Sequence, residues 1–121
     1  MKVLAPRIHG IIDYASVVAL ALAPTLLGLQ GASMQLAYAL AVIHLVLTLL
    51  TDFPLGMAKV VPLRLHGWVE IVVGIALLVL PWVVAGTVDL GNVGRIFYCA
   101  FGAVLIAVWF LTDYGSATHA A

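Results

Sequence analysis

Long apolar runs alternate with short polar connections along this chain. Four runs, at about residues 8–29, 33–51, 65–86 and 95–112, consist almost entirely of apolar side chains. A bilayer core about 30 Å thick requires roughly 20 such residues in a helix that rises 1.5 Å per residue. The runs are too long for strands, and an open strand edge would leave backbone groups unbonded in lipid. The pattern therefore predicts an all-α integral membrane protein with four spanning helices.

Turn-forming residues separate the four runs. Gly31 and Ser33 interrupt the chain between the first two runs, and prolines and a glycine mark the connection at 54–62. Residues 86–92 contain two glycines, an aspartate and an asparagine and separate the last two runs. None of these connections is long enough to divide domains, so residues 1–121 are predicted to form a single membrane domain.

The polar positions recur in register along the chain. RIHGIID at 7–13 returns as RLHGWVE at 64–70, and LTDF at 50–53 returns as LTDY at 111–114. We interpret this pattern as a tandem duplication, with repeat one at about 5–56 and repeat two at about 62–116. Repeats with an even number of helices enter the membrane in the same direction. The expected architecture is a four-helix bundle of two two-helix repeats, related by a pseudo-twofold axis along the membrane normal.

Composition and charge agree with a membrane location. The chain is 65% hydrophobic and 8% charged, and its net charge is zero, so the bilayer is the expected partner and nucleic acid is not. Its mean hydropathy is +1.24. Short cytoplasmic loops are enriched in basic residues. Because four of the five basic residues fall on one side of the predicted bundle, both termini are expected in the cytoplasm: Lys2, Arg7, Lys59 and Arg64, against Arg95.

The repeated segments resemble a known family. Each repeat starts with Arg-x-His-Gly-x-x-Asp/Glu and ends with Leu-Thr-Asp-aromatic, and its first helix ends in Ala23-Pro24-Thr25 or Leu80-Pro81-Trp82. These features resemble the SPW repeat family of small bacterial membrane proteins, whose two-helix unit carries a Ser-Pro-Trp signature. The second copy matches two positions of that signature and the first copy only the proline. The resemblance implies a four-helix protein of the bacterial inner membrane, with no established activity and no catalytic residues.

Two histidines and two carboxylates are candidate metal ligands. His9 and Asp13 are four residues apart, as are His66 and Glu70, so each pair shares one helix face. Imidazoles and carboxylates from facing helices form the metal sites of helical bundles. His9 and His66 are also candidate axial ligands of a haem, with His44 as a further cofactor-binding candidate.

The alternative interpretation of these residues is structural. Ionisable groups in a bilayer face the bundle interior and pair with one another. Carboxylates at helix C-termini favour cationic partners, so Arg7 and Arg64 are predicted to pair with Asp52 and Asp113. On this interpretation no cofactor is bound, and the structural polar cluster comprises Arg7, Asp13, His44, Asp52, Arg64, Glu70 and Asp113.

His44 departs from the repeat, because Leu105 occupies the equivalent position of the second half. Its depth in the second helix matches that of Asp13 in the first, which predicts a buried pair between them. Gly10 and Gly67, beside the two repeated histidines, are predicted to bring the first and third helices into close contact.

These observations favour a non-enzymatic accessory or assembly protein that binds other membrane subunits or a second copy of itself. A metal- or haem-binding redox protein that uses His9 and His66 is the first alternative. A proton or small-ion pathway through His44 is the second.

Overall fold

Four helices account for most of the structure. The computed structural model describes residues 2–115. Within them the helices are α1 (Pro6–Leu27), α2 (Gly31–Leu50), α3 (Leu63–Val83) and α4 (Gly91–Leu111). Each helix is long and apolar enough to cross a membrane. The predicted all-helical fold with four candidate spans is therefore confirmed.

The helix boundaries differ from the expected ones by a few residues. Gly28 adopts φ 68° and closes α1 with a left-handed cap, a conformation that glycine adopts at little steric cost. Gly31, which was expected in the connection, is the first residue of α2, and Gly91 likewise begins α4. Pro24 lies inside α1, near its C-terminal end. Glycine thus marks helix ends here, whereas proline is accommodated within the last turns.

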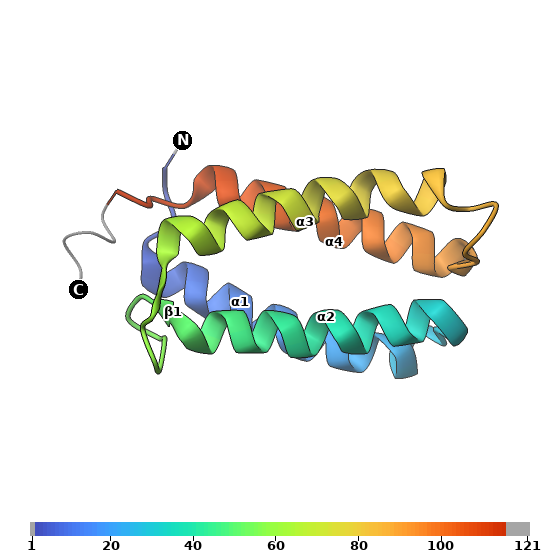
Figure 1. The fold of residues 1–121 in the computed structure, drawn as a ribbon, viewed down its shortest axis with the longest axis horizontal. Helices are drawn as coiled ribbons and strands as arrows, with labels where there is room; N and C mark the ends of the chain where they lie inside the picture. Colours follow the sequence, from blue (N-terminus) through green and yellow to red (C-terminus); the bar gives the residue numbers. More distant parts are fainter. Residues whose placement is uncertain (1, 116–121) are drawn as a thin grey trace.

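The helices pack as two antiparallel hairpins, α1 with α2 and α3 with α4, which form the two layers seen in Figure 1. Strands β1 (Thr51–Asp52) and β2 (Val61–Pro62) pair in parallel in the connection between the hairpins. A second parallel bridge joins Leu4 to Thr112. The starts of α1 and α3 and the ends of α2 and α4 therefore lie together, at what we call the bridged end of the bundle. Strands of two residues are too short to be predicted from the sequence pattern.

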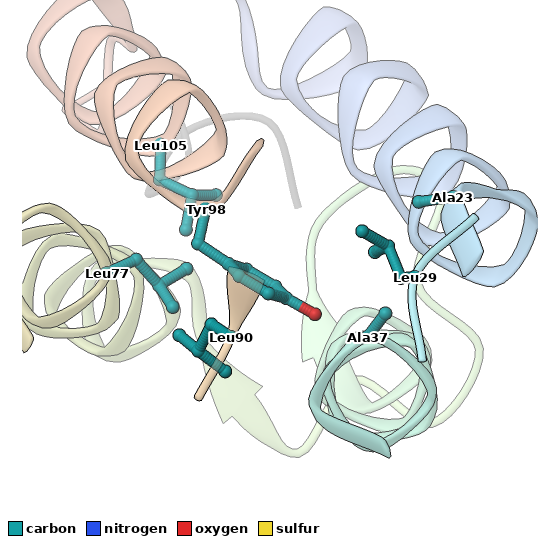
Figure 2. Packing of buried hydrophobic residues seen from close by; sticks show 7 residues of the cluster. All are labelled: Ala23, Leu29, Ala37, Leu77, Leu90, Tyr98 and Leu105. Atoms are coloured by element: carbon teal, nitrogen blue, oxygen red, sulfur yellow. The ribbon is translucent and has the colours of Figure 1, made fainter. Parts of the chain in front are cut away.

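An apolar core fills the half of the bundle away from the bridged end. In Figure 2 the Tyr98 side chain extends from α4 towards Leu29 and Ala37, which belong to the other hairpin. Its hydroxyl donates a hydrogen bond to the Ser33 carbonyl, so this side chain also ties α4 to α2. The buried members of the core are Ala23, Leu29, Ala37, Leu77, Leu90, Tyr98 and Leu105.

Close backbone contact between helices occurs at Gly74 and Gly102, within the second hairpin. A Cβ atom on Gly74 would lie 3.0 Å from the Gly102 carbonyl oxygen, and one on Gly102 would lie 2.6 Å from that of Gly74. Small residues permit such approach in membrane bundles. These two glycines therefore allow α3 and α4 to pack with their backbones in contact.

The predicted contact of α1 and α3 through Gly10 and Gly67 is wrong. The nearest atoms to a Cβ on Gly67 belong to the Tyr114 ring, at 2.6 Å, and those nearest to a Cβ on Gly10 belong to the Phe53 ring and Leu55. Each glycine makes room for the aromatic residue that follows the end of its own hairpin. The physical reason is that these rings fold back over the bridged end and take the space beside the glycines.

Candidate metal site

His9 and His66 lie side by side at the bridged end, one from each hairpin. Their ring centroids are 5.4 Å apart and the rings meet edge to face at 78°. Both residues have an exposed fraction of 0%. The two imidazoles therefore meet where the hairpins face each other.

Asp13 and Glu70 follow one helical turn after the histidines and are also buried. Asp13 Oδ2 lies 3.2 Å from His9 Nε2 and 3.0 Å from His66 Nε2. Glu70 Oε1 lies 2.7 Å from His66 Nε2, and Oε2 lies 3.2 Å from His9 Nε2. Because each carboxylate contacts both imidazoles, these four residues form one group, which we call the His/carboxylate cluster.

Two threonines bind the opposite ring nitrogens of the histidines. His9 Nδ1 lies 2.7 Å from Thr112 Oγ1, and His66 Nδ1 lies 2.6 Å from Thr51 Oγ1. The pairing is crossed, since His9 of the first hairpin meets a threonine of the second, and His66 of the second meets a threonine of the first. These side-chain bonds join the two hairpins directly.

The threonine contacts fix which nitrogen of each imidazole carries a proton. The Thr112 hydroxyl donates its hydrogen to the Val108 carbonyl, and the Thr51 hydroxyl donates its hydrogen to the Leu47 carbonyl. A hydroxyl has one hydrogen, so each threonine accepts from an Nδ1–H. Nε2 is then left to face the carboxylates. Buried partners that orient the far side of an imidazole in this way are typical of metal-ligating histidines.

These two threonines were not identified as site residues from the sequence. The signal was the repeated Leu-Thr-Asp-aromatic segment, which places a threonine at the end of α2 and of α4. Its meaning depends on the packing of one hairpin against the other, because each threonine binds the histidine of the other hairpin.

The centre of the cluster requires a positive charge. With its proton on Nδ1, a neutral imidazole presents a lone pair at Nε2, directed at carboxylate oxygens 2.7–3.3 Å away. Lone pairs that face each other in a buried site repel, and two carboxylates without counter-charge are costly in a low-dielectric interior. Either protons or a metal ion between these atoms removes the conflict.

The arrangement of the ligand atoms suits one ion. One ligand atom from each of the four residues lies within 4.8 Å of the others. Atoms that bind one ion at about 2.0–2.2 Å lie at most roughly 4.4 Å apart, so small side-chain shifts suffice. Asp13 Oδ2 and Glu70 Oε2 are buried and make no hydrogen bond, although both face the cluster. A haem does not fit here, because Glu70 contacts both Nε2 atoms and fills the space that a macrocycle would need.

His44 approaches the cluster from α2. Its Nε2 lies 3.6 Å from Asp13 Oδ1, which confirms the predicted proximity, but this buried nitrogen makes no hydrogen bond. The His44 and His66 ring centroids are 6.1 Å apart. His44 also lines a small cavity together with Glu70, on the side of the cluster towards the middle of the bundle.

The two arginines lie outside the cluster. Within residues 2–115 the ion pairs join histidines to carboxylates, and neither Arg7 nor Arg64 takes part in one. The predicted pairing of these arginines with Asp52 and Asp113 is therefore not formed among the described residues. Each arginine precedes its inward-facing histidine by two residues, and positions two apart point to different faces of a helix. Both arginines are accordingly exposed, whereas the two aspartates are half-buried.

Aromatic rings cover the cluster at the bridged end. The Tyr114 ring centroid lies 5.9 Å from that of His9, and the Phe53 centroid lies 6.3 Å from that of His66. Burial and, after it, the negative charge of Glu70 raise the pKa of Tyr114 above its ordinary value. The cluster is thus closed off from this end by apolar surface.

Comparison of the chain with protein-family models, with curated proteins and with solved structures found no match. The resemblance to the SPW repeat family accordingly stays a prediction from the sequence, and the chemistry of the cluster is inferred from its geometry.

Proposed function

We propose that the protein is a metal-binding integral membrane protein, which holds one divalent transition-metal ion between its two hairpins. The proposal rests on one observation: four buried residues each direct a ligand atom at the same point, and hydrogen bonds to threonines of the opposite hairpin fix the two imidazoles among them. The proposal includes a location in the bacterial inner membrane with both termini in the cytoplasm, and a tandem duplication with a pseudo-twofold axis.

The donor set indicates which ions to expect. Two imidazoles and two carboxylates suit Zn²⁺, Fe²⁺, Mn²⁺ or Co²⁺, whereas the absence of thiolates from the cluster makes it a poor site for Cu⁺. Two carboxylates and a divalent ion sum to zero charge, which lowers the cost of burial. The ion would be bound by ligands from both α1 and α3, so it would also stabilise the association of the hairpins.

Metal analysis of the purified protein tests the proposal. After loading and desalting in detergent, the wild-type protein should retain about one equivalent of metal, with affinity reduced at least tenfold by His66→Gln. Asp89→Asn is the matched control, because Asp89 lies in the connection after α3, where it accepts a hydrogen bond from Gly91 N. Retention of the same amount of metal by wild type and His66→Gln, or failure of the wild type to bind any of the four ions, would contradict the proposal.

The accessory or assembly role predicted from the sequence is a second candidate. The exposed helix faces do not specifically support it, because contact with lipid accounts for them equally well. The proton pathway through His44 also stays a prediction. The two roles differ in an observable way from the proposed one, because neither requires a bound ion.

A further inference from the structure

An open pocket lies at the bridged end, beside the second hairpin. The start of the chain, the start of α3, and the end of α4 with the residues after it form its walls. Its volume is about 320 Å³, and pockets for small molecules usually measure about 300–1,000 Å³. We call it the basic pocket; its charged and aromatic lining residues are Lys2, Arg64, Trp68, Trp109, Asp113 and Tyr114.

Backbone hydrogen bonds hold the walls of the basic pocket together. The Leu111 carbonyl accepts from Val3 N at 2.8 Å and from Leu4 N at 2.9 Å, and Asp113 N donates to the Leu4 carbonyl at 2.8 Å. These bonds keep the first residues of the chain beside the end of α4. Lys2 therefore has a fixed place in a pocket whose other residues come from the second hairpin.

The side chains of the basic pocket suit a headgroup with one negative charge. Lys2 and Arg64 carry two positive charges and Asp113 carries one negative charge, so the charges of the lining sum to +1. Within residues 2–115 neither cation forms an ion pair. The ring centroids of Trp68 and Trp109 are 5.8 Å apart, and Trp68 is 60% exposed. Tryptophan rings are typical of the headgroup level of a bilayer.

A shallow apolar groove adjoins the basic pocket and continues along α3 and α4. Lys2 lies where the two meet, because its Nζ is 5.6 Å from the ring centroid of Trp109, in the pocket, and 5.7 Å from that of Phe110, in the groove. A soluble anion would use the pocket alone, whereas a lipid would use both. The groove is lined by Leu78, Ala103, Ile106, Ala107, Phe110 and Leu111.

We infer that the basic pocket and the groove bind one anionic phospholipid of the phosphatidylglycerol type. Basic pockets beside spanning helices bind anionic lipid headgroups, and the phosphate is expected to contact Lys2 and Arg64. The glycerol hydroxyls of the headgroup are donors that the Asp113 carboxylate can accept. An acyl chain then lies in the groove against Phe110. The inference requires that the helices span a bilayer, for which they are long and apolar enough, and it does not depend on a bound metal ion.

The sequence repeat supplies a matched control for this site. Arg64 corresponds to Arg7 of the first half, 57 residues earlier, and both arginines are exposed near the start of a helix at the bridged end. Arg7 does not line the basic pocket, and Ile11 stands where the second half has Trp68. The two arginines therefore contribute the same charge at the same end of the bundle, but only one of them belongs to the proposed site.

Quenching of tryptophan fluorescence by lipids with brominated acyl chains tests the inference in phosphatidylcholine vesicles. At equal mole fraction, brominated phosphatidylglycerol should quench the wild-type protein more strongly than brominated phosphatidylcholine. Arg64→Gln should lower this preference about fivefold, which corresponds to about 1 kcal/mol per basic residue at an anionic lipid surface. Arg64→Lys should retain most of the preference, and Arg7→Gln should leave it unchanged.

Four results would overturn the inference. Equal quenching by the two lipids in the wild type would show that the pocket has another occupant. An equal decrease in Arg64→Gln and Arg7→Gln would show a general attraction of lipid to the bridged end. Equal quenching by brominated phosphatidylethanolamine would show that net charge is not recognised. Loss of the preference in excess glycerol 1-phosphate would identify a soluble phosphate as the ligand. The wild-type comparison of lipids needs no variant, so it stands whether or not a substituted protein folds.

Discussion

Thr112→Val removes one of the two hydroxyls that orient the histidines and changes little else. The Thr112 side chain is fully buried, and valine is close to it in shape. The substitution leaves the Nδ1–H of His9 without its acceptor. It also removes the bond from the Thr112 hydroxyl to the Val108 carbonyl, a loss that a control must reproduce.

The expected loss of metal affinity follows from the hydrogen bond at 2.7 Å between His9 Nδ1 and Thr112 Oγ1. A buried N–H without a partner costs about 1–3 kcal/mol. If the ring instead moves its proton to Nε2, the metal ligand is lost. Changes to the partners of metal-ligating histidines reduce metal affinity about 10–100-fold, which equals roughly 1.4–2.8 kcal/mol. The two estimates agree, so we expect Thr112→Val to weaken metal binding by one to two orders of magnitude.

A competition titration with a chromophoric chelator measures this affinity in detergent. Thr48→Val is the matched control, because Thr48 is equally buried and its hydroxyl donates to the His44 carbonyl at 2.7 Å. Thr48→Val therefore loses the same kind of hydrogen bond from a hydroxyl to a helix carbonyl, but it does not remove a hydrogen-bond partner from any imidazole nitrogen. Thr51→Val should behave like Thr112→Val. Unchanged metal affinity in Thr112→Val, or an equal decrease in Thr48→Val, would refute the assignment of the imidazole protons.

Three further predictions concern packing, coupling and orientation. Gly102→Leu should lower the free energy of unfolding, measured by thermal unfolding, by about 1–3 kcal/mol or more through overpacking. Gly86→Leu should have little effect, because nothing lies within 4 Å of its Cβ position, and equal losses in the two variants would contradict the helix contact. A double-mutant cycle with Asp13→Asn and His44→Leu should give a coupling energy of about 0.5–3 kcal/mol, and strictly additive losses would show that the pair does not interact. A reporter fused after Gly115 should lie in the cytoplasm and one inserted at Gly86 on the opposite side, and the reverse result would overturn the orientation.

The sequence pattern predicts the helices and the two histidine–carboxylate pairs of the site, because each of these depends on residues close together in the chain. Apolar runs of sufficient length specify the spans, and a histidine four residues before a carboxylate specifies a shared face. Thr112 could not be assigned in the same way, since its partner His9 lies at the opposite end of the chain. The error at Gly10 has a related cause, because the ring of Phe53 fills the space that a neighbouring helix was expected to fill. Contacts between hairpins are the part of this fold that local patterns do not specify.

The crossed pairing of histidines and threonines has a consequence for biosynthesis. His9 enters the membrane with the first helix, but its partner Thr112 follows the last one, so the first hairpin alone has no acceptor for the Nδ1–H of His9. During translation the site therefore stays incomplete until α4 has left the ribosome and packed beside α3. Under the proposed function, an ion that needs both histidines correctly oriented would be acquired only after insertion of the whole bundle, which would make metal uptake a late step in the maturation of this protein.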